Sequence, residues 1–253
     1  MPTRLTILTG SSRGMGAAIA EQLLQPGHAV LGIARQVHPG LADLAAARGA
    51  TAWQWTRDLG HPGPVADELA DWLATIAPDT FAEVTLINNA ALLGHIGPVD
   101  EDDPTSIVNA LRVGLEAPLL LSAAFVRATA AWPGRRRILN ISSGLGRRAM
   151  AGSAVYCAVK AGLDHLSRAM ALDEASRPNG VRVVSLAPGV IDTDMQVQLR
   201  SADERGFPDK ARFVALKSER QLSTPADAAR RVIDFLHRAD FGETVVADVR
   251  ADA

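Results

Sequence analysis

The sequence predicts an α/β fold, a single domain built on a doubly wound parallel sheet of about seven strands with helices on both faces. Short apolar runs that suit buried strands alternate with amphipathic helical segments along the 253 residues. A glycine-rich turn follows the first apolar run and leads into a helical segment. No repeat, low-complexity tract or linker divides the chain, and about 250 residues is a usual length for one α/β domain. We therefore expect residues 1–253 to form one domain.

Composition limits the classes of function. A net charge of −2 gives no electrostatic reason to expect nucleic acid or an anionic membrane as a partner. The single cysteine, Cys157, excludes an internal disulfide and fits a reducing compartment, so we expect a cytoplasmic protein. The six histidines lack metal-ligand spacing, and we expect no metal site. The N-terminal apolar run is too short for a signal peptide, and no apolar stretch approaches the roughly 20 residues that span a bilayer.

The first strand and the turn after it predict a dinucleotide site. Residues 5–8 read as a buried strand, and helical spacing from Met15 to Leu23 predicts a helix that ends at Pro26 and Gly27. A strand, a glycine-rich turn and a helix in this order direct backbone N–H groups and a helix N-terminus at a phosphate. We expect cofactor contacts from this turn, at Gly10, Ser12, Arg13, Gly14, Met15 and Gly16.

The second strand, residues 28–34, bears on the choice of cofactor because it ends at Arg35. At this point of a dinucleotide fold an acidic residue favours a free ribose 2′-hydroxyl, whereas an arginine accommodates a 2′-phosphate. Arg35, with Arg13 in the glycine-rich turn, therefore favours NADP over NAD. The alternative is that both are solvated surface residues in an arginine-rich chain.

The later elements continue the alternation. Further strands are predicted at residues 52–56, 84–87, 137–141, 181–186 and 244–249, and helices at 65–76, 104–131, 156–174 and from Thr224 onward. Ligands in such sheets bind at the carboxyl ends of the strands. Residues 194–222 interrupt the pattern as a polar, mixed segment, which we interpret as an insertion that covers the substrate.

Tyr156 and Lys160 are rare residues placed four apart. Tyr156 is the only tyrosine, and Lys160 is one of three lysines beside 23 arginines. On a helix these side chains are neighbours, and a nearby positive charge lowers the pKa of a tyrosine from about 10. The pair is therefore a candidate catalytic acid and its helper. The alternative is ordinary packing for Tyr156 and a solvated Lys160.

Taken together, these motifs resemble the classical short-chain dehydrogenase/reductase family, whose fold is Rossmann-like, along nearly the whole chain. Ser143, Tyr156 and Lys160 match the catalytic residues, and the thirteen-residue offset from Ser143 to Tyr156 is the usual one. Residues 156–164 and 188–196 most resemble the sepiapterin-reductase-like branch, which includes bacterial benzil reductases. Beyond the glycine-rich turn, the resemblance implies cofactor contacts from Arg35, Asp58, Leu59, Asn89, Ala90, Lys160, Pro188, Gly189, Ile191 and Thr193.

The resemblance implies NADPH-dependent reduction of a small ketone or diketone, aromatic ones included. Tyr156 would protonate the developing alkoxide, Ser143 would donate a hydrogen bond to the same oxygen, and Lys160 would bind the nicotinamide ribose. It also implies a homodimer or homotetramer formed through the helices near 104–131 and 156–174. Arg147 and Arg148 could favour an anionic substrate or form a solvated loop. Candidate pocket residues, each of which could instead be ordinary packing, are Leu145, Met150, Val190, Met195, Leu199 and Phe207.

The chain departs from the family pattern at two positions. Ala91 replaces a usual glycine, and Gly114 stands where a catalytic asparagine normally lies; Asn109 is five residues away on a different face. In the family, the main-chain carbonyl of that asparagine holds a water of a proton relay. Pro118 has no N–H with which to bond the Gly114 carbonyl, so we hypothesise that Gly114 keeps the relay water. The alternatives are a helix flaw, which costs about 1 kcal/mol relative to alanine, and a regulatory NADP-binding protein that has lost turnover.

Overall fold

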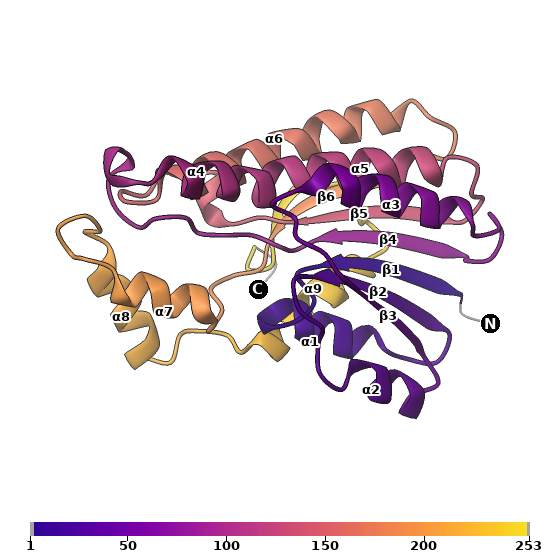
Figure 1. The fold of residues 1–253 in the computed structure, drawn as a ribbon, viewed down its shortest axis with the longest axis horizontal. Coiled ribbons are helices and arrows are strands. Elements are labelled where there is room, and N and C mark those ends of the chain that lie inside the picture. Colours follow the sequence, from indigo (N-terminus) through magenta and orange to yellow (C-terminus); the bar gives the residue numbers. More distant parts are fainter. Residues whose placement is uncertain (1–2, 252–253) are drawn as a thin grey trace.

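A computed structural model describes residues 3–251 and shows a parallel sheet between two layers of helices (Figure 1). The sheet has seven strands in the order β3-β2-β1-β4-β5-β6-β7, and every neighbouring pair is parallel. The predicted fold class is confirmed. The strands are β1 Arg4–Thr9, β2 His28–Ala34, β3 Thr51–Thr56, β4 Glu83–Asn88, β5 Arg135–Ile141, β6 Arg182–Ala187 and β7 Val246–Asp248.

One face of the sheet is covered by α3 (Pro62–Ala74), α5 (Ala117–Ala128) and α6 (Ala154–Ala175). Side chains such as Leu69 and Leu121 pack there against alternate strand residues such as Leu31, because successive strand residues point to opposite faces. The other face carries α1 (Gly14–Leu23), α2 (Leu41–Ala47) and α9 (Pro225–Leu236). The short helix α2 was not predicted, because seven residues give too little periodicity to stand out.

The helix predicted over residues 104–131 is interrupted. It consists of α4 (Pro104–Leu111), a π-helical turn, η2 (Arg112–Glu116), and α5. The N–H of Ala117 donates to the carbonyl of Arg112, five residues back. Pro118 accounts for the irregularity, because it has no N–H with which to bond the Gly114 carbonyl.

The combined helix Pro104–Ala128 is long and apolar enough, by length and composition, to span a membrane. The sequence-based expectation that no apolar stretch approaches this length is therefore wrong. The apolar residues of this helix form part of the core, since Ala117, Leu121 and Phe125 are buried between α3 and the sheet.

Residues 194–222 form α7 (Asp194–Ser201) and α8 (Lys210–Ser218), which Figure 1 shows beyond the carboxyl ends of the strands. These helices share a third apolar cluster with the loops after β4 and β5. Leu199, Phe207 and Phe213 pack there with Leu93 and Met150. The segment is thus held by contacts with loops and not by the sheet itself.

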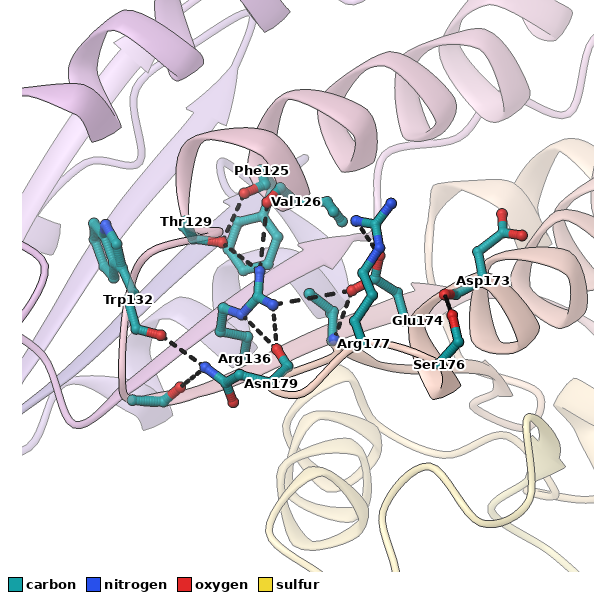
Figure 2. Close-up of polar contacts among 12 residues, drawn as sticks. Phe125, Val126, Thr129, Trp132, Arg136, Asp173, Glu174, Ser176, Arg177 and Asn179 are labelled. Carbon is teal, nitrogen blue, oxygen red and sulfur yellow. Dashed lines mark hydrogen bonds and ion pairs between the residues drawn. The ribbon is translucent and has the colours of Figure 1, made fainter.

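A buried polar network lies at the other end of the sheet, where β5 begins and α6 ends (Figure 2). The guanidinium of Arg136, at the start of β5, donates to the Asn179 carbonyl at 3.1 Å and lies 4.0 Å from the Glu174 carboxylate. Glu174 also accepts from the N–H of Val181 at 2.8 Å and pairs with Arg177. Burial lowers the pKa of Arg136, and the charge of Glu174 opposes that effect. The network therefore joins the end of α6 to the start of β5.

Replacing Glu174 with alanine should destabilise the protein strongly. The substitution leaves the buried Arg136 without its counter-charge and the Val181 N–H without an acceptor, so we expect a loss of about 3 kcal/mol in the free energy of unfolding. Urea denaturation measures the loss. Asp173→Ala, at the exposed neighbouring position, serves as the control and should change stability by less than about 0.5 kcal/mol. Equal losses in the two variants would contradict a special role for the network.

Candidate active site

A cavity of about 860 Å³ opens at the carboxyl ends of the strands. It is lined by every residue predicted from the sequence to contact cofactor or substrate, except Phe207 and Arg147, and by Ser143, Tyr156 and Lys160. Phe207 is fully buried and packs on Phe213, with their ring centroids 5.5 Å apart. Gly114 does not line the cavity, although its neighbour Val113 does. The structure thus brings together residues that are spread over most of the sequence.

The glycine-rich turn forms a cradle of backbone at one end of the cavity. Gly10 and Gly14 have φ values of 69° and 57°, a conformation that favours glycine. A Cβ atom on Gly16 would lie 2.0 Å from the Gly10 carbonyl oxygen, so no side chain fits there. The Asn89 amide holds the turn by donating to the Thr9 carbonyl at 2.9 Å. A narrow backbone cradle at the start of α1 fits the pyrophosphate of a dinucleotide.

Arg13, Arg35 and Arg57 are among the arginines that line the cavity. Arg35 is exposed and forms no ion pair or hydrogen bond with any residue in the described range 3–251. Arg13 instead pairs with Asp194 of α7 at 2.5 Å, and both side chains are 67% exposed. Arg57 is bound by Glu68 at 2.6 Å. Arg35 is therefore free to bind an anionic group, while Arg13 links the turn to α7.

The two serines at the end of β5 have different partners. The Ser143 hydroxyl oxygen accepts from the N–H of Leu145 at 3.2 Å, and Ser143 lines the cavity together with Tyr156. The Ser142 hydroxyl donates to the carboxylate of Asp164 at 2.5 Å. Because the Ser142 hydroxyl is engaged by Asp164, Ser143 is the serine of the pair left to act with Tyr156, as the sequence offset predicts.

Tyr156 and Lys160 lie together near the start of α6, with the lysine Nζ 5.5 Å from the centre of the tyrosine ring. The Nζ donates to the Ile141 carbonyl at 2.7 Å. Burial raises the pKa of Tyr156 to about 12, and the hydrogen bond with Ser143 opposes this rise. Burial also lowers the pKa of Lys160 to about 8, against the opposing charge of Asp164.

The expectation that Tyr156 has a lowered pKa because of Lys160 is wrong, since burial raises that pKa to about 12. Desolvation of the phenol outweighs other effects, and the lysine amine is directed at a backbone carbonyl. The raised pKa keeps Tyr156 protonated near neutral pH. That is the state that a proton donor in a reduction requires.

Gly114 is packed against α6. A Cβ atom at this position would lie 2.5 Å from the Cγ1 atom of Val159, so an asparagine side chain does not fit the observed packing. The need for close packing explains the glycine. Asn109 lines the cavity, and its Oδ1 atom lies beside Gly60, 2.8 Å from where a Cβ would stand. The hypothesis that the Gly114 carbonyl holds a relay water stays a prediction.

Sequence reasoning missed several cavity residues. Arg212 and Phe213 of α8 and Arg250 after β7 all line it. The position of Arg250, directly beyond the carboxyl end of a predicted strand, was a usable signal. Arg147 pairs with Asp248 at 3.6 Å, whereas Arg148 lines the cavity and its side chain has no polar partner among the described residues. Within residues 3–251, no group of three or more histidine, cysteine, aspartate or glutamate side chains could hold a metal ion.

Known proteins resemble this chain over nearly its full length. Residues 4–204 match the family model described as short chain dehydrogenase. The benzil reductase ((S)-benzoin forming) of Bacillus cereus is 32% identical over 247 residues, which cover 97% of this chain and 99% of that protein. The sepiapterin reductase of Meriones unguiculatus is 32% identical over 254 residues, which cover 93% and 92% of the two chains.

Solved structures agree with these matches. A short-chain dehydrogenase/reductase from Burkholderia vietnamiensis is 39% identical with a TM-score of 0.66, and the match covers 98% of each chain. A metagenomic short-chain oxidoreductase in complex with NADP is 29% identical with a TM-score of 0.71, over 98% and 95% of the chains. A Brucella melitensis reductase in complex with NAD, 22% identical with a TM-score of 0.81 over 98% and 96% of the chains, shares the fold. The chain belongs to the short-chain dehydrogenase/reductase family, on the branch of the benzil and sepiapterin reductases, and is an oxidoreductase that acts on carbonyl or alcohol groups.

Proposed function

We propose that the protein is an NADPH-dependent reductase of small ketones and diketones, aromatic ones included. The observation that carries this proposal is the grouping of Ser143, Tyr156 and Lys160 on one wall of a cavity whose other end is a dinucleotide cradle. The name of the relative from Bacillus cereus, a benzil reductase, supports a diketone as substrate.

Each catalytic side chain has a role that its surroundings support. Bound NADPH would supply the hydride to the carbonyl carbon. Tyr156, protonated because of burial, donates its proton to the carbonyl oxygen, and Ser143 donates a hydrogen bond to that oxygen. Lys160 is fixed by the Ile141 carbonyl and binds the ribose hydroxyls with its remaining N–H donors.

The end of the cavity beside Tyr156 suits an apolar substrate. Tyr156 packs in the third apolar cluster, whose members Leu145, Met150, Leu199 and Phe213 also line the cavity. Since several of these residues lie on α7 and α8, residues 194–222 serve as the cover of the substrate. Arg148, at the same cavity and without a partner among residues 3–251, would accept an anionic substituent.

A ketone panel with Tyr156→Phe tests the reductase. We expect NADPH oxidation with aromatic diketones such as benzil, and a loss of about 10²–10⁴-fold in kcat/KM for Tyr156→Phe because the general acid is removed. The thermal midpoint and the NADPH dissociation constant, measured by fluorescence, should stay unchanged. Tight NADPH binding without turnover of any ketone would contradict the proposal and favour a regulatory NADP-binding protein.

The preference for NADPH depends on Arg35. Arg35→Asp should lower the ratio of kcat/KM with NADPH to that with NADH by about 10- to 150-fold, because a charge-assisted hydrogen bond to the 2′-phosphate contributes about 1.5–3 kcal/mol. Steady-state kinetics with both cofactors measures the ratio. Arg127→Asp, an exposed residue at the end of α5, is the matched control. An unchanged ratio in Arg35→Asp means that Arg35 does not bind the 2′-phosphate of NADPH.

A homodimer or homotetramer fits an apolar surface on the helices around α4, α5 and α6. The exposed side chains Val108, Leu111, Leu119 and Leu172 lie on these helices, and Leu172 is 76% exposed. We expect sedimentation equilibrium to give a dimeric or tetrameric mass. Leu119→Glu with Leu172→Glu should reduce that mass, because charge at an apolar contact is costly to bury. A monomeric wild-type protein would contradict this assembly.

A further inference from the structure

Asp164 is a buried acid that the proposed reaction does not use directly. It lies on α6 one helical turn beyond Lys160, and it is 1% exposed. Acidic side chains are almost never fully buried unless a cation pairs with them. Within residues 3–251, no lysine, arginine or histidine lies close enough to Asp164 to form an ion pair. The position therefore requires an explanation other than charge pairing.

Only one of the two carboxylate oxygens of Asp164 has hydrogen-bond partners in the described chain. Its Oδ1 atom accepts hydrogen bonds from the Ser142 hydroxyl at 2.5 Å and from the Ser185 hydroxyl at 2.6 Å. Its Oδ2 atom is buried and has no partner in the described chain. A Cβ atom on Gly146 would lie 2.6 Å from that oxygen, so only a glycine fits at this place in the loop after β5.

These contacts join α6 to the end of β5. Lys160 donates to the carbonyl of Ile141, and Asp164 accepts from Ser142. Two residues one turn apart on the helix thus each bond one of two successive residues at the strand end, directly before Ser143. Asp164 also reaches β6 through Ser185, so the same carboxylate fixes the helix and two strands.

We propose that Asp164 is a positioning residue for the catalytic side chains: through Ser142 it fixes the end of β5 next to Ser143, and it places a buried carboxylate one helical turn from Lys160, where it acts on the lysine. The inference rests on the proposed reductase function. A charge in a buried, weakly screened site acts strongly on its neighbours. A buried polar atom without a protein partner is costly, and each one calls for an explanation.

The elements η2 and β7, which pack against α6, also carry charged residues, and these are engaged in other ion pairs. On η2, Arg112 lies 3.9 Å from Glu116. On β7, Asp248 is bound by Arg250 at 2.6 Å and by Arg147. The remaining groups near the lysine, Tyr156 and the serines of β5 and β6, are uncharged at neutral pH. Of the described charges, Asp164 is the one that raises the pKa of Lys160 against the effect of burial.

Titration of Lys160 in the cofactor-free protein tests the charge without any need for turnover. The chain has only three lysines, so ¹³C-lysine labelling gives three side-chain signals in an NMR titration, and the exposed Lys217 provides an internal reference. Asp164→Asn keeps an oxygen that can accept from both serines but removes the charge. We expect the midpoint of Lys160, about 8 in the wild type, to fall by about one pH unit, a tenfold change in proton affinity.

Ser185→Ala is the matched control, because it removes one hydrogen bond to Asp164 and leaves the charge in place. Its lysine midpoint should stay at the wild-type value. In the reductase, the alkaline limb of the kcat/KM profile should move to lower pH in Asp164→Asn and stay in place in Ser185→Ala. A purely structural Asp164 would lower the thermal midpoint of Asp164→Asn without moving the lysine midpoint, and that result overturns the proposal.

Three further results have a defined meaning. If Asp164→Asn does not fold, the Lys160 midpoint is measured in Asp164→Ser, which is smaller and can still bond the two serines. The same fall in the midpoint is expected. If no ketone is reduced while the lysine midpoint falls as expected, the reductase function fails but the effect of Asp164 on Lys160 stands. If ketones are reduced and the lysine midpoint does not move, the inference about Asp164 alone is wrong.

Discussion

Burial of the start of α6 against the end of β5 is the constraint on which the candidate site depends. The same loss of water raises the pKa of Tyr156 to about 12 and lowers that of Lys160 to about 8. Desolvation favours the neutral form of each group, so it moves acids and bases in opposite directions. Hydrogen bonding and charge from Ser143 and Asp164 then oppose these shifts. The chemistry of the pair is thus determined by how the helix packs and not by its spacing alone.

Close packing also explains the irregular helix that faces α6. Gly114 lacks the Cβ atom that would collide with Val159, and Pro118 lacks the N–H that would bond the carbonyl of residue 114. Gly114 lies within the π-helical turn Arg112–Glu116, and Pro118 follows two residues after its end. The absence of a side chain at residue 114 allows direct contact between this helix and the helix that carries Tyr156.

Local patterns predicted most of the fold and most of the candidate site residues that the structure brings together in one cavity. The strands, the glycine-rich turn and the offset from Ser143 to Tyr156 are short-range features, and a sequence displays them directly. The direction of the pKa shift at Tyr156 could not be predicted, because it depends on burial by distant segments. The contact between Ser142 and Asp164 joins residues 22 positions apart, and neither residue type reveals its partner. The short helix α2 and the exact form of η2 depended likewise on packing that no local pattern encodes.

The two ends of β5 and α6 are fastened by different means. Because α6 runs antiparallel to β5, the start of the helix meets the end of the strand, and the end of the helix meets the start of the strand. Arg136 and Glu174 join one pair of ends through a buried network, while Ile141 and Ser142 join the other pair through Lys160 and Asp164. A helix held at both ends cannot shift along the strand without breaking buried polar contacts at each.

One wall of the cavity is therefore fixed by β5 and α6, whereas α7 and α8 are held mainly by apolar loop contacts. Any adjustment to the size of a substrate is easier on the side of α7 and α8, since moving them breaks no buried network of this kind.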